Sequence, residues 1–251
     1  MRWQRIGWIV LAGSMALAGC ENASFSTDQQ RLEQLDETTG PVVRSAIDAV
    51  GGPEAWSRLG QIRMHLVLSV FDPSRGRYVL SGRALLDVPT GKLTVWSQTA
   101  RGPWKVTVNR YDASAGEDTN LPAQRRQAIV GALSQVAHRL YGPWNLVGPA
   151  EKPRLTGPAM VGGLRMARLQ VTENTRRTQA YYVDPQTNLL RFVTAGSDIP
   201  GEQGSVTIYQ WTDLPDGLRL PARMESRSIG RYVLLGDDPI WQVELLDLQT
   251  Q

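Results

Sequence analysis

Two series of short alternating segments, separated by one long helical segment, restrict the fold of this 251-residue chain more than any other feature. Within each short segment apolar side chains recur at every second position, which is the period of a β-strand with one buried face. Turn-forming Gly, Pro, Asp and Asn residues separate neighbouring segments, so consecutive strands are expected to pair as antiparallel meanders. The ten segments expected to form strands are 62–70, 77–88, 92–99, 104–111, 164–171, 178–183, 189–194, 205–211, 219–226 and 241–248.

The segment between the two series, residues 121–140, has the clearest helical period in the chain, and its apolar stripe must be buried against another element. Two shorter helices are expected at residues 41–50 and 53–59, and the Gly- and Pro-rich residues 142–163 are expected to form a loop or an irregular edge. An order of strands, one helix and more strands excludes a parallel α/β fold. The expected fold class is therefore mainly β (α+β): a strongly curved antiparallel sheet of about ten strands, wrapped around the long helix.

The N-terminus has the features of a secretory signal. Residues 1–5 are cationic, and residues 6–18 form an apolar run that is too short to span a membrane. The run ends in Leu17-Ala18-Gly19-Cys20, which resembles the lipobox of bacterial lipoproteins, and Cys20 is the one cysteine of the chain. The resemblance implies diacylglycerol and an acyl group such as palmitate on Cys20. Because Glu21 rather than Asp follows the cysteine, the outer membrane is the favoured destination.

Charge and cysteine content narrow the function classes. Cleavage after residue 19 removes two Arg residues and no acidic residue, so the net charge falls from +3 to +1. Nucleic-acid binding requires a clustered basic surface, which a nearly neutral chain does not suggest. One cysteine excludes an intramolecular disulfide and a Cys-based zinc site. The expected organisation is a signal peptide over residues 1–19, a lipidated Cys20 with a polar tether over 20–38, and one folded domain over 39–251. The alternative for part of the tether is a backward extension of the first helix.

No group of residues in the sequence indicates a reaction. Ser134 and His138 are four residues apart and share a helix face, but neither a Gly-x-Ser-x-Gly motif nor an orienting third group accompanies them. We therefore interpret the pair as the polar edge of an amphipathic helix. His65 is expected to face solvent or a partner, and two distant histidines form no metal-binding pattern. The expectation is a protein that is not an enzyme and has no cofactor or metal.

A curled sheet with few helices inside leaves room for an apolar cavity. Such a cavity is lined by aliphatic and aromatic side chains, whereas ordinary core packing would use the same residue types. Candidates therefore come from the aromatic residues of the expected strands and from the apolar stripe of residues 121–140. The candidate cavity-lining residues are Trp96, Trp104, Leu133, Val136, Leu140, Tyr209 and Trp211.

Three motifs resemble proteins of the LolA/LolB lipoprotein-carrier superfamily. Residues 49–63 carry a helix end, Gly51-Gly52-Pro53 and the entry to the first strand; residues 182–190 carry an Asp-Pro-x-Thr hairpin; and residues 216–223 carry a strand entry that begins Asp-Gly-Leu. Together the motifs span roughly residues 40–250. The resemblance implies an unclosed half-barrel that is capped by helices and holds a cavity for an acyl chain.

These features lead to one expected function and one alternative. The first is a membrane-anchored periplasmic lipoprotein that binds an acyl chain or a lipidated protein in a hydrophobic cavity, in lipoprotein or lipid trafficking. The alternative is a non-catalytic envelope scaffold or assembly lipoprotein that docks a protein partner. The expected partners are the membrane, through the lipid on Cys20, and a lipid or lipoprotein ligand. The sequence identifies no protein partner.

Overall fold

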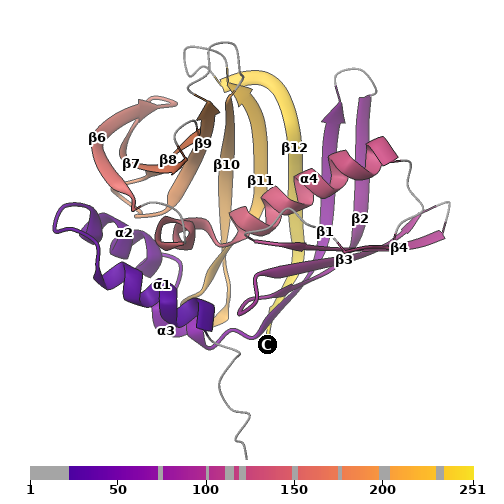
Figure 1. Ribbon diagram of the computed structural model, residues 1–251, viewed down its shortest axis with the longest axis horizontal. Coiled ribbons are helices and arrows are strands. Elements are labelled where there is room, and N and C mark those ends of the chain that lie inside the picture. The colour runs from indigo at the N-terminus through magenta and orange to yellow at the C-terminus, as the bar shows by residue number, and fades with distance from the viewer. Residues whose placement is uncertain are drawn as a thin grey trace, which may run out of the picture.

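The computed structural model describes residues 23–72, 76–99, 102–110, 116–118, 123–148, 152–174, 177–197, 204–229 and 235–251. These residues form one antiparallel sheet of twelve strands together with a small number of helices (Figure 1). The strands are β1 (Gln61–Asp72), β2 (Gly76–Asp87), β3 (Lys92–Thr99), β4 (Gly102–Asn109), β5 (Gly116–Asp118), β6 (Arg154–Val161), β7 (Leu164–Asn174), β8 (Arg177–Val183), β9 (Leu190–Ser197), β10 (Gly204–Asp213), β11 (Arg219–Ile229) and β12 (Leu235–Thr250).

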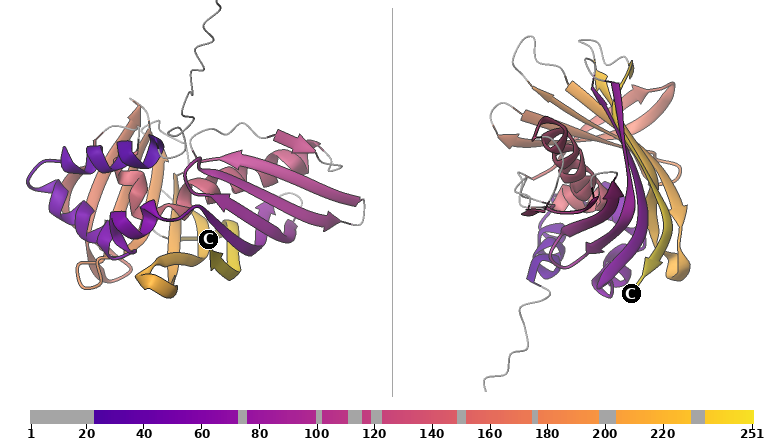
Figure 2. Two further views of the ribbon diagram at one scale, coloured as in Figure 1. Left: turned by 90° about the horizontal axis from the view of Figure 1, so that it is seen from below. Right: turned by 90° about the vertical axis from the view of Figure 1, so that its right-hand side faces the viewer.

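Two meanders meet in the middle of the sheet. Strands β1 to β5 form one meander and β6 to β12 form the other, and β1 pairs with β12 where they meet. Strands β5 and β6 are therefore the two edges, and no pairing joins them in the described part of the chain. A twisted sheet of this width curls, and Figures 1 and 2 show it curving around the helices without closing. The expected unclosed half-barrel is confirmed.

The position of the long helix follows from this strand order. Helix α4 (Ala123–Leu140) comes after edge strand β5 and before edge strand β6, so the chain must cross the concave face between them (Figure 1). A helix of 18 residues is about 27 Å long, which is enough to cross about five strands. The expected helix is confirmed. The shorter helices are α1 (Ala23–Glu33), α2 (Thr39–Asp48), α3 (Gly52–Ser57), η1 (Gly142–Val147) and η2 (Pro215–Gly217).

Strand alternation separates a buried inner face from an exposed outer face. In β1 the side chains of Ile62, Leu66 and Leu68 have no exposed surface, whereas Arg63 between them is exposed. Inward residues of the strands pack with the stripe of α4 in one large core. Helix α3 joins this core through Trp56, whose Nε1 donates a hydrogen bond to the Val50 carbonyl at 3.0 Å. Burial of each large apolar side chain contributes about 1.5–3 kcal/mol to stability.

The structure differs from the sequence-based expectation at two places. Residues 23–33, expected to belong to a tether, form helix α1, and Asp36 then accepts hydrogen bonds from the backbone N–H groups of Thr38 and Thr39, at the start of α2, at 3.0 and 2.6 Å. Residues 154–161 form the edge strand β6, so an irregular edge, one of the two alternatives expected for residues 142–163, is confirmed there. The sheet has twelve strands rather than about ten because it includes β6 and the three-residue strand β5. Cys20 lies outside the described residues.

Candidate functional site

Helix α4 packs closely against part of the concave face of the sheet. The side chains of Leu133, Val136 and Ala137 have no exposed surface, so no space as large as a water molecule adjoins them. They face the inward residues of β4, among which Trp104 and Val106 are 3% and 1% exposed. The contact between α4 and the sheet is therefore a close-packed core in this conformation.

The structure brings six of the seven candidate cavity residues into the interior. Five of them are at most 3% exposed, and the sixth, Trp211, is partly buried against the same core. The five are Trp104, Leu133, Val136, Leu140 and Tyr209. Trp96 is separated from the others: it is 40% exposed and lies on the outer face, because its neighbour Val95 points inward. Their role in holding a ligand stays a prediction.

Tyr209 and Trp211 form the part of the interior beneath η1. Their rings stack at 5.6 Å between centroids with an angle of 11°, and Trp211 Nε1 donates a hydrogen bond to the Leu190 carbonyl at 2.7 Å. Gly142, the first residue of η1, lies on this ring with a φ of +52°, and a Cβ at that position would be 2.7 Å from Trp211 Cη2. Glycine therefore permits both the turn after α4 and its close approach to β10.

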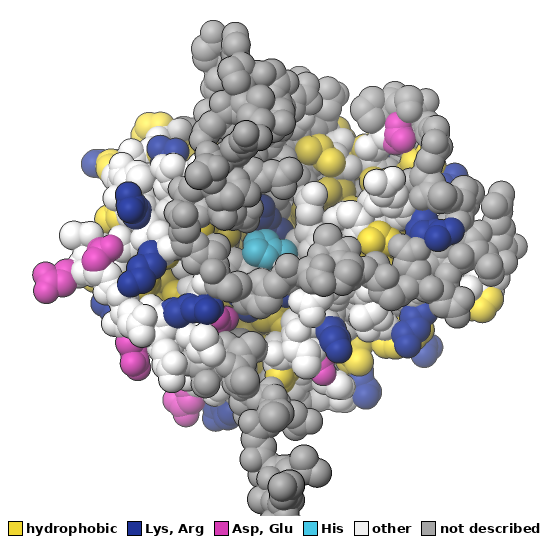
Figure 3. All heavy atoms as spheres, in the orientation of Figure 1, with side chains coloured by type: hydrophobic (Ala, Val, Ile, Leu, Met, Phe, Trp, Pro, Cys, Tyr) yellow, Lys and Arg dark blue, Asp and Glu magenta, His cyan; other side chains and the backbone are white. Residues whose placement is uncertain are grey.

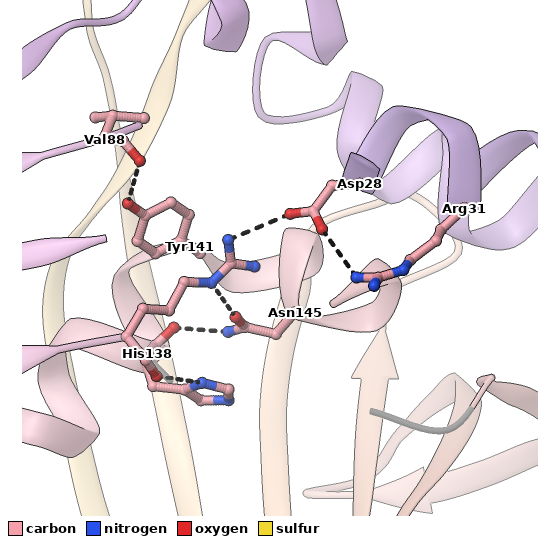
Figure 4. Close-up of polar contacts among 7 residues, drawn as sticks. Asp28, Arg31, Val88, His138, Tyr141 and Asn145 are labelled. Carbon is pink, nitrogen blue, oxygen red and sulfur yellow. Dashed lines mark hydrogen bonds and ion pairs between the residues drawn. The ribbon is translucent and has the colours of Figure 1, made fainter. Parts of the chain in front are cut away.

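A buried polar network holds α1 against the end of β4 and the C-terminal end of α4 (Figure 4). Arg110, which follows β4, lies 3.4 Å from the Asp28 carboxylate, and both side chains are 3% exposed. Arg110 Nε donates a hydrogen bond to Asn145 Oδ1 at 3.0 Å, and its guanidinium lies 3.9 Å from the centroid of the Tyr141 ring. Asn145 Nδ2 donates to the His138 carbonyl at 2.6 Å. The network thus connects three segments that are far apart in sequence.

The electrostatics of this network are governed by burial. Burial raises the pKa of Asp28, although the guanidinium groups of Arg110 and Arg31 lower it. The desolvation cost of the carboxylate therefore exceeds the attraction that these two arginines supply, as is common for buried ion pairs. Arg31 contributes less because it is 39% exposed and 3.5 Å away.

His138 is held neutral inside the network. Its Nδ1 lies 3.3 Å from the Arg110 carbonyl, which can only accept, so Nδ1 carries the proton. Burial, followed by the charges of Arg139 and Arg110, lowers the pKa of His138 to about 3. Its Nε2 and Ser134 Oγ are both buried without a hydrogen-bond partner among the described residues. The pair is thus more enclosed than the polar edge expected from the sequence.

A second buried arginine, Arg139, lies near the C-terminal end of α4. Arg139 is 7% exposed and donates a hydrogen bond from Nη1 to Gln179 Oε1 at 2.8 Å. The Tyr181 hydroxyl donates to the same oxygen at 3.1 Å. Burial also raises the pKa of Tyr209, so this phenol stays protonated. The interior of the half-barrel therefore contains positive charge from α4 beside strand β8.

An apolar groove of about 430 Å³ opens between α2 and the edge strands β6 and β7. Its lining is apolar except for Arg165, and three lining residues, Val42, Leu155 and Ala167, pack against the main core. The pairing of β6 with β7 is irregular between Leu155 and Pro158, and this irregularity forms one wall. The volume lies within the usual range of small-ligand sites. An apolar ligand that enters this groove could reach the core without crossing the sheet.

Two further grooves, of about 770 and 630 Å³, lie side by side on the outer face and share His65, Arg83 and Trp96. His65 lies on the outer face as expected, and its Nε2 is 2.8 Å from Ser81 Oγ. On the face shown in Figure 3, by contrast, Lys and Arg side chains are scattered singly. Within the described ranges no group of His, Cys, Asp and Glu is arranged to hold a metal ion, and no helix is long and apolar enough to cross a membrane.

The buried network was not identifiable in the sequence. Asp28 and Arg110 are 82 positions apart, and Arg139 and Gln179 are 40 positions apart. Arg139 is one of the polar residues that lie largely outside the apolar stripe of residues 121–140, so the helical pattern gave no signal of its burial. Spacing alone gives no means of pairing such residues.

The fold has counterparts among solved structures at low sequence identity. A LolA superfamily protein from Nitrosomonas europaea superposes with a TM-score of 0.53 and 11% identity, over 84% of this chain and 93% of that chain. A DUF1329 family protein from Desulfovibrio piger superposes with a TM-score of 0.50 and 10% identity, over 84% and 92% of the two chains. No protein-family model and no curated protein matches the sequence. The expected structural resemblance is confirmed: the protein has a LolA-like fold.

Proposed function

We propose that this protein is a lipid-anchored protein of the bacterial cell envelope, facing the periplasm, that binds an acyl chain or the lipidated end of another protein. The anchor is diacylglycerol on Cys20, and the outer membrane is the favoured location because Glu21 follows the cysteine. Binding requires no bond-making, since each buried methylene contributes about 0.8 kcal/mol. The protein is accordingly proposed to be non-catalytic.

The observation that carries this proposal is the apolar groove between α2 and β6–β7. It opens at an edge of the unclosed half-barrel and adjoins the core through Leu155 and Ala167. An acyl chain that enters there reaches apolar surface directly and leaves the outer face of the sheet unchanged. Arg165 at the rim supplies a cation for the carboxylate or phosphate end of a lipid.

A second candidate function is a scaffold that docks a protein partner. The close packing of Leu133 and Val136 against the sheet supports it, because a filled interior offers no volume for a hydrocarbon tail at that place. The two candidates make different predictions. A carrier binds lipid through the groove at α2, whereas a scaffold binds none there.

Lipid binding is tested on the chain from Glu21 onward, which is the mature chain without Cys20, with a fluorescent fatty acid and by native mass spectrometry for co-purified lipid. Val42→Trp places a large ring in the groove from α2 and is expected to weaken binding about tenfold, the equivalent of about two methylene contacts. Val79→Trp, at a position that is 59% exposed outside the groove, is the matched control. Absence of lipid from the purified chain together with no probe binding would refute the carrier and favour the scaffold.

The anchor is tested separately in cells. Incorporation of a labelled fatty acid and recovery of the protein in the membrane fraction are both expected to disappear in Cys20→Ala. Cleavage before residue 20 with no added mass on the cysteine would contradict the anchor, whatever the result of the fatty-acid assay.

A further inference from the structure

The position of α1 places the body close to the membrane, if the proposed anchor on Cys20 is correct. Helix α1 begins at Ala23, three residues after Cys20, and three residues span at most about 11 Å. Asp28 fixes α1 to Arg110 at the end of β4. The lipid therefore holds the body against the bilayer surface instead of on a long tether.

The end of the sheet nearest to α1 can be identified from strand pairing. Asn109 at the end of β4 pairs with Lys92 at the start of β3, and Lys92 pairs with Asp87 at the end of β2. Asp87 also pairs with Gln61 at the start of β1, so these residues share one end of the sheet. The last residues of β12 also lie there, because Thr250 pairs with Ile62. Arg63 and Gln249, which line the larger outer-face groove, are within three residues of this end.

One transverse row of side chains crosses the outer face through both grooves. Successive pairs in the strand register are Leu246 with His65, His65 with Arg83, Arg83 with Trp96, and Trp96 with Lys105. Trp96 and Leu246 are 40% and 48% exposed, and Lys105 Nζ lies 5.7 Å from the Trp96 ring centroid. Cations beside exposed aromatic and aliphatic groups are the composition found where proteins meet the bilayer interface.

The backbone makes this row concave. Strand β2 pairs with β3 only from Arg83 onward, and the strands part beyond Trp96, where β3 and β4 turn away from β1 and β2 (Figure 1). On the other side, Asp247 has a φ of +52° where the pairing of β12 with β1 shifts. The row therefore has the separation of β2 from β3 on one side and the bulge between β1 and β12 on the other. This arrangement produces two adjoining grooves.

The described residues offer the cations of the grooves few counter-charges. Arg63 and Arg83 form no ion pair or hydrogen bond with the described residues, and the contact of Lys105 is with the Trp96 ring. Asp247 is the one carboxylate among the described lining residues, and Asp118 of β5 is the register partner of Lys105. Three cations against these two acidic residues, around an exposed indole, favour an anionic and partly apolar occupant.

We propose that the outer-face grooves around Trp96 bind the anionic phospholipid headgroups of the membrane to which Cys20 is attached. Arg63, Arg83 and Lys105 meet phosphate groups, and Trp96 and Leu246 enter the interfacial region. This contact orients the body, so that the concave face and the groove at α2 are directed away from the headgroups. It is independent of whether the groove at α2 binds an acyl chain.

The test uses the chain from Glu21 onward, which contains every described element and lacks Cys20, in co-sedimentation with lipid vesicles. Binding to vesicles that contain phosphatidylglycerol is expected, with weak binding to phosphatidylcholine alone. The triple variant Arg63→Gln, Arg83→Gln, Lys105→Gln is expected to lose roughly fivefold in partition per cation. The triple variant Arg58→Gln, Lys152→Gln, Arg154→Gln has the same net charge, changes exposed cations elsewhere, and is expected to bind nearly as well as the parent.

A single-cysteine reporter tests the orientation. A fluorophore at Gln98→Cys, in the smaller outer groove, is expected to be quenched by brominated lipids, and one at Gln186→Cys, in the turn after β8, is not. Equal binding of the two triple variants, or equal quenching of the two reporters, would overturn the proposal. If the groove variant loses binding to an acidic peptide but keeps its affinity for vesicles, the partner is a protein and the proposal is likewise wrong. None of these outcomes depends on fatty-acid binding or lipidation of Cys20.

Discussion

Replacing Asp28 with alanine is expected to release α1 from the body while the twelve-stranded sheet stays folded. The reason is the position of the carboxylate in a buried ion pair: the Asp28 and Arg110 side chains are each 3% exposed and lie 3.4 Å apart. Removal of one member of such a pair costs about 3–5 kcal/mol when the other member stays buried.

The apolar burial of the described side chains of α1, residues 27–33, contributes less than that cost. Among the side chains of residues 27–33, Leu32 is the buried apolar one, at 7% exposure, and its burial contributes about 2 kcal/mol. Release of α1 lets water reach the Arg110 guanidinium. For Asp28→Ala, the state with α1 detached is therefore expected to be lower in free energy than the state with α1 attached. The expected readout is amide hydrogen exchange: residues 27–33 lose protection in Asp28→Ala, and the strands keep theirs.

Two further variants separate the ion pair from helix propensity. Arg31→Ala removes a partner of Asp28 that is 39% exposed, which is worth at most about 1 kcal/mol, and is expected to keep α1 protected. The double variant Asp28→Leu, Arg110→Met removes both charges and is expected to restore protection, because burial raises the pKa of Asp28 and shows that the pair is costly to bury. Full protection of α1 in Asp28→Ala would refute this reasoning.

Two other predictions concern the sheet and the buried histidine. Gly82→Ala is expected to destabilise the protein by about 1–3 kcal/mol, because the added Cβ would collide with the Trp96 carbonyl oxygen where β2 and β3 part. Gly131→Ala in α4 adds a Cβ with no atom within 4 Å and is expected to stabilise the protein by about 0.5–1 kcal/mol. Thermal unfolding of both variants checks the sign of each change. The pKa of His138 is lowered to about 3 in the folded protein, and its value in the unfolded chain is about 6.5. As the pH drops below 6.5, the unfolded state therefore binds a proton that the folded state does not. The free energy of unfolding falls as a result, by at most about 3 kcal/mol near pH 4.5. Denaturant titrations at pH 7 and 4.5 are expected to show a smaller loss in His138→Gln, and an unchanged loss would contradict the assignment.

The sequence was sufficient to predict the sheet because its signals are local. Alternation such as that from Ile62 to Val70 and the turn at Asp184–Asn188 each lie within one segment, and the helix over residues 121–140 is defined by its own stripe. Helix α1 lies where a tether or a backward extension of the first helix was expected, and its signal is not local. Residues 23–33 have no strong apolar stripe, and their helix is fixed by a distant partner, Arg110.

Prediction of the site residues was less successful, because alternation identifies a face but not its surroundings. Trp96 and Trp104 are both strand aromatics, yet one lies on the outer face and the other in the core. Their positions depend on the registers of β3 with β2 and β4, which pair residues from different segments. The polar network is non-local in the same way, so the composition of α4 alone did not reveal that Arg139 and the Nε2 atom of His138 are buried.

The chain connectivity indicates which part of the helix layer can open for a ligand. Helix α4 links the two edge strands, and its stripe residues Leu133, Val136 and Ala137 have no exposed surface, so its displacement would expose the core that they cover. Helices α1 and α2 precede β1, and no described strand comes before them. The chain therefore connects them to the sheet at their C-terminal side. The groove at Val42 lies beneath α2, and α1 is held by the Asp28–Arg110 pair, whose carboxylate is already costly to bury. Entry of an acyl chain is therefore expected to displace α1 and α2 and to leave α4 in place. Exchange protection that falls in α1 and α2 on lipid binding, but not in α4, is the signature of this route.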